Sequence, residues 1–418
     1  MVIRDPSCDD DFDPNSLSCE VALARILEQV TEVGGHECLA LRSALGRVLA
    51  APLYSPFAVP AHTNSAMDGY AVSVDSLPAS GTARLKVIGS AFAGRPFSGT
   101  AQLGQAVRIM TGAAMPTGTD TVVMQEHVAV HGDEVELDGH HKCGQNVRAA
   151  GEDLKPGQLA LAGGRRLVPP DLGLIASLGI GEVTVRRRVR VAYFSTGDEL
   201  RSIGETLGPG EIYDSNRYTL NAMLKRSEVE IIDMGVVRDR RDAVESALRE
   251  ASQIADVVIT SGGVSVGEAD YIKEVLATIG EVRFWKVAMK PGRPLAFGSL
   301  GQARFFGLPG NPVSVMVTFY HFVQPALFKM AGTVATPPLL IKARTTAVLK
   351  KRPGRMEFQR GILSRDADGE LRVTATGDQG SGILYSMASA DCFIMLGVDT
   401  GNVPADTVVD VQPFQGLL

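Results

Sequence analysis

At 418 residues, the chain is too long for one hydrophobic core, and we expect three or four structural units. Hydrophobic residues make up 45% of the chain, which is enough to build those cores. No stretch approaches the ~20 consecutive apolar residues of a membrane-spanning helix. The net charge of −6 argues against general nucleic-acid binding, so any anion must be held by a local arrangement of groups.

The start of the chain and the cysteines indicate where the protein works. Residues 1–13 are acidic and interrupted by proline, without the basic start and apolar run of a secretory signal. We expect residues 1–15 to form a disordered tail. Five cysteines show no paired spacing, which indicates reduced thiols and a cytoplasmic protein rather than a disulfide framework. They are Cys8, Cys19, Cys38, Cys143 and Cys392.

The first half of the chain begins with a helix and continues with β-structure. Residues 18–33 carry apolar side chains at helical spacing, with Ser18 as the expected N-cap and Gly34-Gly35 as the stop. Short alternating runs separated by Gly and Pro then predict a β-rich unit with many turns. These runs include 83–89, 107–110 and 121–130. Helical character returns briefly near Pro169-Pro170-Asp171.

Predicted strands and helices alternate from residue 189 to about 332. The strands cover 189–194, 229–237 and 256–260, and the helices cover 217–226, 242–254 and 271–279. This alternation predicts a parallel sheet with helices on both faces, where ligands bind beyond the carboxyl ends of the strands. Arg186-Arg187-Arg188, before the first strand, is expected to be a solvated segment. Residues from about 337 to 418 predict a small β unit.

A glycine-rich loop follows the third of these strands. Gly262 and Gly263 let the backbone approach an anion closely, and Ser261 and Ser265 add hydroxyl donors before a helix N-terminus. Asp270, at the end of the loop, would repel a phosphate unless a divalent metal bridged the two. The alternative, that Asp270 only caps the helix, is equally compatible with this motif alone.

Acidic residues also follow the other two strands. Asp198 and Glu199 come after the first strand, and Asp239 comes after the second. In a parallel sheet these carboxylates meet Asp270 at one edge. One such acid is usually a cap or a turn residue, but acids at three successive strand ends favour a metal site, and oxygen ligands suit Mg²⁺.

Cationic and proline-rich turns form a second group of candidates. Lys290, Pro291 and Arg293 lie in a proline-stiffened loop after Lys286, and a stiff cationic loop lowers the ordering cost of binding an oxyanion. A surface turn with solvated charges is the alternative. Further on, Asn311 suits an N-cap and Pro312 the first helical position, so capping explains this turn, although its helix end also suits an anion.

Polar clusters in the first half of the chain have the composition of turns. They are 64–70, Thr111-Gly112, and the group Arg148, Glu152 and Asp153. Metal-binding residue types occur at Glu126-His127 with His131 and again at 140–143. The first set lies in a predicted strand and the second in a predicted surface loop, so neither favours zinc. We find no Ser-His-Asp or Cys-His arrangement, P-loop or dinucleotide fingerprint.

Taken together and in this order, the motifs resemble the MoeA family of molybdopterin molybdenumtransferases and the related C-terminal domain of gephyrin. The resemblance covers nearly the whole chain from about residue 16. The segments that carry it are 64–71, 195–200, 212–217, 260–271, 289–294 and 308–314.

The resemblance implies a multidomain fold that combines α/β and β units. An elongated N-terminal domain would be discontinuous, built from 16–57 and 151–185, with a β domain inserted at 58–150. A central αβα domain of three layers with a mostly parallel sheet would span 186–333, and a small β domain would span 334–418. The family also implies a homodimer, in which the partner's inserted domain completes the cleft between the central and C-terminal domains.

The resemblance further implies the last step of molybdenum cofactor biosynthesis. Molybdate would be inserted into adenylylated molybdopterin, and the adenylate would be hydrolysed with release of AMP. Transient contacts with the adenylyltransferase and with apo-molybdoenzymes would follow, and neither nucleic acid nor membrane is expected as a partner. Two alternatives are a molybdopterin adenylyltransferase, which is a short single-domain protein, and a gephyrin-like dimeric scaffold, for which the chain shows no fused domain or long linker.

Residue roles follow from the same motifs. Glu199, Asp239 and Asp270 would hold Mg²⁺ or act on the anhydride, and Asp68 would join these catalytic residues from the partner subunit together with Thr111 and Asp153. The remaining substrate-binding candidates are Arg148, Ser261, Gly262, Gly263, Lys286, Lys290, Pro291, Pro309, Pro312, Ser314, Arg360 and Ser381. Within this set Lys290, Pro291, Ser314, Arg360 and Ser381 would form the molybdate pocket. Arg240, Tyr385 and residues 390–392 depart from the family pattern.

Overall fold

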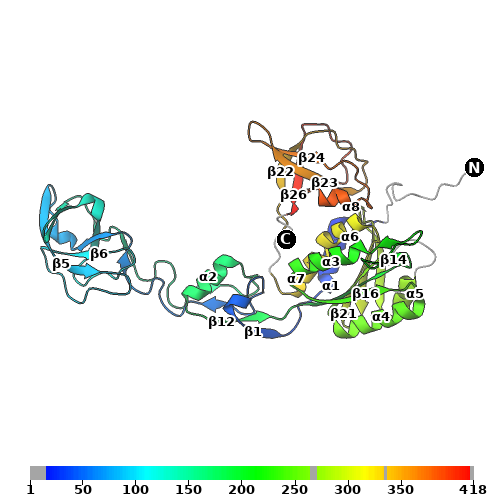
Figure 1. Ribbon diagram of the computed structural model, residues 1–418, viewed down its shortest axis with the longest axis horizontal. Helices are drawn as coiled ribbons and strands as arrows, with labels where there is room; N and C mark the ends of the chain where they lie inside the picture. The colour runs from blue at the N-terminus through cyan, green and yellow to red at the C-terminus, as the bar shows by residue number, and fades with distance from the viewer. Residues whose placement is uncertain (1–15, 264–270, 334–336, 415–418) are drawn as a thin grey trace, which may run out of the picture.

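The computed structural model describes residues 16–263, 271–333 and 337–414. Figure 1 shows an elongated molecule in which a slender arm leads from a β domain to a central domain, with a smaller β domain beside it. Within the described ranges, no helix is long and apolar enough to cross a membrane. The predicted tail at 1–15 and Asp270 lie outside the described residues.

A six-stranded sheet forms the middle layer of the central domain. Four strands run parallel in the order β16, β13, β17, β21, and the hairpin of β20 and β18 extends the sheet in the antiparallel direction. The strands are β13 (Arg190–Thr196), β16 (Glu230–Val237), β17 (Val257–Ser261), β18 (Glu281–Lys286), β20 (Pro294–Leu300) and β21 (Ala303–Leu308). The predicted, mostly parallel sheet is confirmed, and its two central strands β17 and β21 are nearly wholly buried.

Helices cover both faces of this sheet, which confirms the three-layer αβα architecture. On one face lie α4 (Arg241–Ile254) and α5 (Tyr271–Ile279). The other face is covered by α1 (Cys19–Gln29), α3 (Ser215–Arg226) and the continuous run α6 (Pro312–Thr318), η4 (Phe319–Val323, π-helical) and α7 (Gln324–Met330). The two apolar cores on either side are separate.

The first helix begins where the sequence predicts it but ends early. Ser18 Oγ accepts a hydrogen bond from Val21 N at 3.2 Å, as expected of an N-cap. The prediction that the helix continues to residue 33 is wrong, because the chain turns extended at Val30. It then runs beside the end of α7, where Val33 N donates to Met330 O at 2.8 Å.

The inserted β domain is one six-stranded sheet in the order β7, β4, β6, β5, β9, β8. Its strands are β4 (Gly69–Val72), β5 (Thr82–Ala91), β6 (Gln105–Ile109), β7 (Thr121–Met124), β8 (Ala129–His131) and β9 (Glu134–Asp138). The continuous strand predicted over 121–130 is wrong, because a 3₁₀ turn, η3 (Gln125–His127), divides it. This turn places Glu126 and His127 at the exposed surface.

The arm between these domains is built by short pairings between distant segments. They are β1 (His36–Ala40) with β12 (Glu182–Arg186), β2 (Leu53–Tyr54) with β11 (Leu159–Leu161), and β3 (Asn64–Ser65) with β10 (Val147–Arg148). The arm also carries η1 (Leu41–Ser43) and α2 (Pro169–Ser177), and η2 (Val74–Ser76) follows β4 in the inserted domain. These pairings agree with an N-terminal unit made of two chain segments, while the exact domain boundaries remain predictions.

The C-terminal domain is a small closed β unit. Its strands follow the order β19, β23, β24, β22, β26, β25, and a further pairing of β25 with β23 closes the ring. The strands are β19 (Met289–Lys290), β22 (Ile341–Thr345), β23 (Met356–Arg365), β24 (Leu371–Ala375), β25 (Cys392–Leu396) and β26 (Val408–Pro413), with the short helix α8 (Leu384–Ala388). Because β19 belongs to the chain of the central domain, the two domains share this sheet. The stiff loop predicted around Lys290 is therefore partly a strand.

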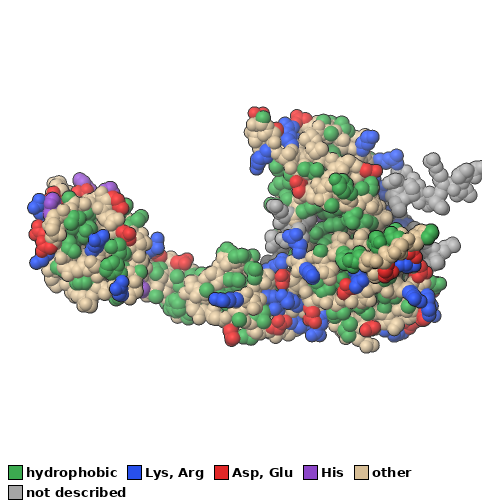
Figure 2. Space-filling view, viewed as in Figure 1, with side chains coloured by type: hydrophobic (Ala, Val, Ile, Leu, Met, Phe, Trp, Pro, Cys, Tyr) green, Lys and Arg blue, Asp and Glu red, His purple; other side chains and the backbone are tan. Residues whose placement is uncertain are grey.

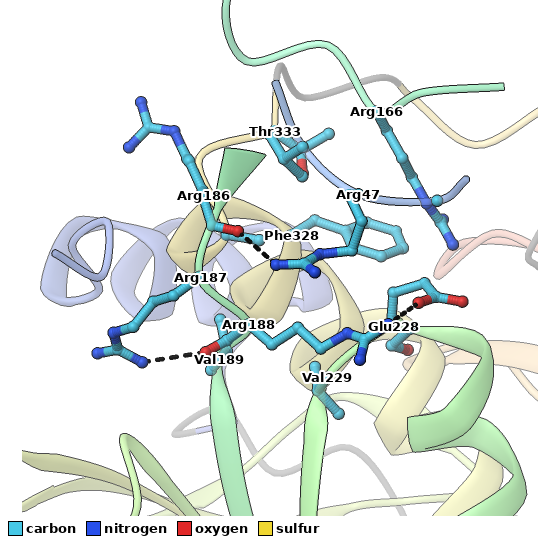
Figure 3. A pocket seen from close by; sticks show the side chains of 14 residues that line it. Arg47, Arg166, Arg186, Arg187, Arg188, Val189, Glu228, Val229, Phe328 and Thr333 are labelled. Atoms are coloured by element: carbon cyan, nitrogen blue, oxygen red, sulfur yellow. Dashed lines mark hydrogen bonds and ion pairs between the residues drawn. The ribbon is translucent and has the colours of Figure 1, made fainter. Parts of the chain in front are cut away.

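Arginines brace the junction of the arm and the central domain (Figure 3). Arg186 pairs with Glu32 at 2.6 Å and Arg187 with Asp256 at 2.7 Å. Arg188, which is exposed, pairs with Glu228 at 3.0 Å (Figure 3), so the segment expected to be solvated is also ion-paired. Arg47, Arg166 and Arg188 point into a pocket of about 20 Å³, which has room for roughly one water. Arg166 also donates to Arg226 O at the C-terminal end of α3. The cluster thus serves as a structural joint.

His321 joins the central domain to the C-terminal domain. Its ring lies in η4, 4.1 Å from the ring of Phe358 on β23 and 6.0 Å from that of Phe393 on β25. Its Nε2 is buried without a hydrogen-bond partner among the described residues. Burial lowers the pKa of His321 from 6.5 to about 4. The imidazole is therefore neutral in the folded protein at neutral pH.

We predict that acidification weakens this junction. Between pH 6.5 and 4 an unfolded chain binds a proton at His321 that the folded protein does not, so stability falls by up to about 3 kcal/mol as the pH drops through that window. His321→Phe, which keeps the ring stacking, should lose this component. Trp285, the only tryptophan, packs in the same core and reports its unfolding by fluorescence. The exposed His127→Phe is the control, and equal pH profiles for all three proteins would refute the prediction.

Candidate functional site

The carboxyl ends of β13, β17 and β21 lie side by side and carry three of the predicted loops. Asn216, in the first turn of α3, joins two of them. Its Nδ2 donates to Ser261 Oγ at 2.8 Å, after β17, and to Gly310 O at 2.7 Å, after β21. This bridge sets Ser261 and the buried Pro309 next to one another, as the candidate cleft requires.

Glycine is needed at two positions of the loop after β17. Gly262 and Gly263 adopt φ values of +90° and +67°, which are unfavourable for residues with a Cβ. A Cβ at Gly262 would lie 2.8 Å from Thr196 O, and one at Gly263 would lie 2.4 Å from Ile272 Cδ1. Gly262 and Gly263 are thus packed against β13 and α5. Residues 264–270, which include Ser265, lie outside the described residues.

Three carboxylates gather after β13 and β16. Asp198 Oδ1 accepts from Asp239 N at 3.4 Å, and the Glu199 carboxylate folds back over Gly197, where a Cβ would lie 2.5 Å from Glu199 Oε2. Partial burial and the negative charges of Asp198 and Glu199 raise the pKa of Asp239. Within the described residues, no three His, Cys, Asp or Glu side chains already form a metal-binding group. The predicted third ligand, Asp270, lies in a part of the chain that is not described.

A second bridge connects the central domain to the C-terminal domain. Asn311 is the N-cap residue of α6 and Pro312 its first residue, as predicted, but the side chain does not cap the helix. Instead Asn311 Nδ2 donates to Ser381 Oγ at 3.0 Å, and Val313 N donates to Ser381 O at 3.1 Å. Figure 1 shows α8 of the C-terminal domain beside α6. Ser381 is thus fixed at the boundary of the two domains.

Arg360 is a buried cation without a carboxylate in contact. The residue is 1% exposed, and its guanidinium donates from Nε to Ser386 Oγ at 3.0 Å and from Nη2 to Gly380 O at 2.9 Å. The structure shows no partner for Nη1 within the described residues. Burial lowers the pKa of Arg360 to about 10, although Asp378 acts in the opposite direction. A buried charge is costly unless it is paired, so this group is poised to bind an anion.

The remaining molybdate-pocket candidates lie along α6. Lys290 lies opposite Glu357 in the parallel pairing of β19 with β23, the strand that carries Arg360. A Cβ on Gly292 would lie 2.7 Å from Thr318 Oγ1, so the loop after Pro291 rests against α6. Ser314, which is 4% exposed, is four residues before Thr318 and therefore on the same face of that helix. Lys286 ends β18, where its carbonyl accepts from Leu17 N.

The candidates of the first half of the chain lie elsewhere in the molecule. Thr111 donates to Asp68 Oδ1 from its backbone N at 2.7 Å and from Oγ1 at 2.8 Å, which lowers the pKa of Asp68. Arg148 pairs with Asn64 in the register of β10 and β3, and Asp153 is exposed nearby in the chain. Figure 1 shows these elements at the far end of the arm, well separated from the central domain. The structure therefore forms two groups of candidate residues.

Sequence reasoning missed the side chains that hold these groups together. Asn216, Gln379 and Ser386 were not among the candidates, and Asn311 was expected only to cap a helix. Asn216 lies in 212–217, one of the segments that resemble the MoeA family, and this resemblance could have indicated its role. Nothing in the local sequence marks Ser386, because its partner Arg360 is 26 residues away.

Three family profiles match the chain in succession. They are the MoeA N-terminal region (domain I and II) over 17–179, a probable molybdopterin binding domain over 192–329, and the MoeA C-terminal region (domain IV) over 342–414. A protein of Haemophilus influenzae named molybdopterin molybdenumtransferase is 45% identical over 404 residues, covering 96% of this chain and all of the relative. The chain belongs to the MoeA family. A relative of the same name from Nostoc sp. is 38% identical over 86% of this chain and 84% of its own length.

Solved structures of the MoeA family agree with this fold. A molybdopterin biosynthesis MoeA protein from Pyrococcus horikoshii OT3 matches with a TM-score of 0.83 at 28% identity, covering 96% of this chain and all of the other. A second structure from the same organism matches with a TM-score of 0.77 at 31% identity and the same coverage. The agreement extends over the arm as well as the central domain, so the multidomain fold predicted from the sequence is confirmed.

We predict that Asp239→Asn stabilises the protein at neutral pH in the absence of divalent cations. The raised pKa of Asp239 means that the carboxyl group is harder to ionise in the folded protein than in the unfolded chain. The folded protein is therefore less stable once the pH has risen through that pKa and Asp239 is charged. Removing the charge should raise the thermal midpoint by about 1–3 °C at pH 7 and have no effect at acidic pH. The control is Asp242→Asn, which removes an exposed carboxylate paired with Arg240 and should not stabilise. A lower midpoint for Asp239→Asn would contradict the prediction.

Proposed function

We propose that this MoeA-family protein is a molybdopterin molybdenumtransferase that inserts molybdate into adenylylated molybdopterin, with hydrolysis of the adenylate and release of AMP. The observation that carries this proposal is the buried guanidinium of Arg360 at the boundary between the central and C-terminal domains. Family membership supports the reaction, and the two bridges formed by Asn216 and Asn311 support a single cleft that runs from the sheet edge to Arg360. Figure 2 shows a recess between the two domains on one face of the molecule.

The chemistry of the Arg360 end suits a metal oxyanion. Molybdate is a dianion that only accepts hydrogen bonds, and this end of the cleft offers a guanidinium, the hydroxyl of Ser381 and the nearby Lys290. Pro291 and Ser314 complete the proposed pocket along α6. Because Arg360 hydrogen-bonds only to neutral acceptors in the part of the chain that the structure describes, an oxyanion would supply a directly contacting counter-charge.

The acidic end of the cleft suits a divalent cation. Asp198, Glu199 and Asp239 supply hard oxygen donors, and burial together with repulsion from Asp198 and Glu199 raises the pKa of Asp239, a repulsion that a cation would relieve. We propose Glu199 and Asp239 as Mg²⁺ ligands, with Asp270 as the predicted third. When bound, Mg²⁺ neutralises phosphate charge and makes the phosphorus more electrophilic. The Ser261–Gly263 loop and the pair Lys286 and Pro309 would hold the pterin and phosphate groups between the two ends, with Pro312 at the start of α6.

A homodimer would account for the separation of the two groups of candidates. Asp68, Thr111, Arg148 and Asp153 lie on the arm side of the molecule, away from the cleft of their own chain (Figure 1). We propose that they enter the partner's cleft, where the Asp68–Thr111 pair forms part of the catalytic site. Because a two-fold axis applies the same contact twice, each dimer would hold two such sites. We also propose that the protein acts in the cytoplasm, which agrees with four free thiols among the described residues. Transient contacts with the adenylyltransferase and with apo-molybdoenzymes are part of the same proposal.

The activity test uses adenylylated molybdopterin, Mg²⁺ and molybdate. We expect AMP release that depends on both ions, together with reconstitution of an apo-molybdoenzyme. Arg360→Met should reduce the molybdate-dependent rate about 100-fold at low molybdate, because it removes a charge-assisted contact. Arg365→Met, on the exposed part of the same strand, is the matched control and should be unchanged. Transfer of AMP from ATP to molybdopterin without molybdate would instead indicate an adenylyltransferase.

The shared site can be tested by mixing two inactive variants. Asp68→Ala disables the arm and Glu199→Gln disables the cleft, so each homodimer should be inactive. Subunit exchange between equal amounts would form heterodimers in which one site carries both substitutions and the other carries neither. Activity should then recover to about a quarter of the wild-type value. No recovery after exchange, verified by mass spectrometry of the mixed dimers, would place each complete site within one subunit.

A further inference from the structure

The loop and short helix that follow β24 enclose the side chain of Arg360. Arg360 Nε donates to Ser386 Oγ at 3.0 Å, and the Ser386 hydroxyl donates in turn to Ile383 O at 2.7 Å. Since the serine proton is directed to Ile383, a lone pair of the same oxygen faces the guanidinium. Ser386 is 2% exposed, so water does not compete for this contact.

Gln379 holds the backbone of the same residue. Its Oε1 accepts from Arg360 N at 2.7 Å, and its Nε2 donates to Arg360 O at 3.2 Å. The pairing of β23 with β24 ends at Gly361 and Ala375, and beyond it Thr376 N still donates to Arg360 O at 3.0 Å, so the Gln379 amide adds to the backbone contact at the end of the ladder. This reciprocal pair fixes the position from which the Arg360 side chain starts.

Among the described residues, the Arg360 side chain donates hydrogen bonds only to neutral acceptors. Ser386 Oγ takes Nε, and the carbonyl of Gly380 takes Nη2 at 2.9 Å, with that of Asp378 at 3.4 Å. These groups fix the plane of the guanidinium without cancelling its charge, and they leave Nη1 without a partner among the described residues. Gly380 is also the residue before Ser381, which Asn311 holds against α6. The orientation of Arg360 is therefore tied to the wall of the cleft.

We propose that Ser386 and Gln379 are positioning residues for the molybdate pocket, which direct the free edge of Arg360 at the bound oxyanion while leaving its charge uncompensated. This inference rests on the proposed function, because it assumes that molybdate binds at Arg360. An arginine on a long flexible stem loses conformational freedom when it binds an anion. Ser386 and Gln379 remove that freedom before the anion arrives, which is preorganisation of the binding site.

The test compares Ser386→Ala with the rescue variant Ser386→Thr, which keeps a hydroxyl, and with the control Ser389→Ala on the exposed part of the same turn. AMP release is measured while molybdate and adenylylated molybdopterin are varied in separate series. Ser386→Ala should raise the KM for molybdate about tenfold, with kcat at saturating molybdate and the KM for adenylylated molybdopterin within twofold of wild type. Ser386→Thr should restore most of the loss, and Gln379→Ala should act in the same direction as Ser386→Ala.

Equilibrium dialysis with molybdate alone separates this inference from the proposed function. If the wild type releases no AMP, the proposed function fails, but tenfold weaker molybdate binding by Ser386→Ala would still support the positioning role. Molybdate affinity within twofold of wild type for Ser386→Ala, or an equal rise in both KM values, would overturn it. Trp285 fluorescence checks that each variant is folded. If Ser386→Ala does not fold, the nearly isosteric Ser386→Cys takes its place, because its thiol is a weaker acceptor. The same comparison of molybdate affinity with wild type then tests the positioning role.

Discussion

The positive charge of Arg360, buried among neutral acceptors, constrains how the C-terminal domain and the central domain are joined. Burial lowers its pKa to about 10 against the opposing effect of Asp378, and within the described residues its hydrogen bonds go to a hydroxyl and to backbone carbonyls. A core optimised only for stability would pair such a group or replace it with an apolar side chain. The proposed molybdate pocket would account for this arrangement, because an incoming anion would supply the counter-charge.

The long arm separates the candidate residues of the inserted domain from those of the central and C-terminal domains. Its strands pair segments 82 to 150 residues apart, and the Arg-rich joint fixes its direction at the central domain. The Asp68–Thr111 pair lies beside β4 and β6 of the inserted domain, at the far end of the arm (Figure 1), so under the proposed function a partner molecule would have to bring a cleft to it. A rigid joint then matters as much as the residues at the tip, because a small change in its angle is multiplied along the arm.

The sequence reveals this fold where the pattern is local and hides it where partners are distant. Buried apolar runs and helical spacing predict β13, β17, α4 and α5 closely, because strand and helix periodicities belong to the segment itself. The end of α1, the break after Met124 and the ion pairs of Arg186 to Arg188 depend on neighbours from other parts of the chain. The sequence predicts the loops after the strands as sites. It does not predict the hydrogen bonds of Asn216, Asn311 and Ser386 that hold these loops together, since each bond joins residues 26 to 94 positions apart.

The two ends of the cleft carry opposite and uncompensated charges, and the structure keeps them apart. The charges that shift the pKa of Asp239 are Asp198 and Glu199, and the one that acts on Arg360 is Asp378, so each end responds only to its own surroundings. The two hydrogen-bonded bridges between them are made by uncharged amides and hydroxyls, those of Asn216, Ser261, Asn311 and Ser381. If the carboxylates and the guanidinium met directly, they would neutralise one another in a salt bridge and neither would bind an ion. If Mg²⁺ and molybdate bind as proposed, this separation would let one cleft hold a cation at one end and an oxyanion at the other.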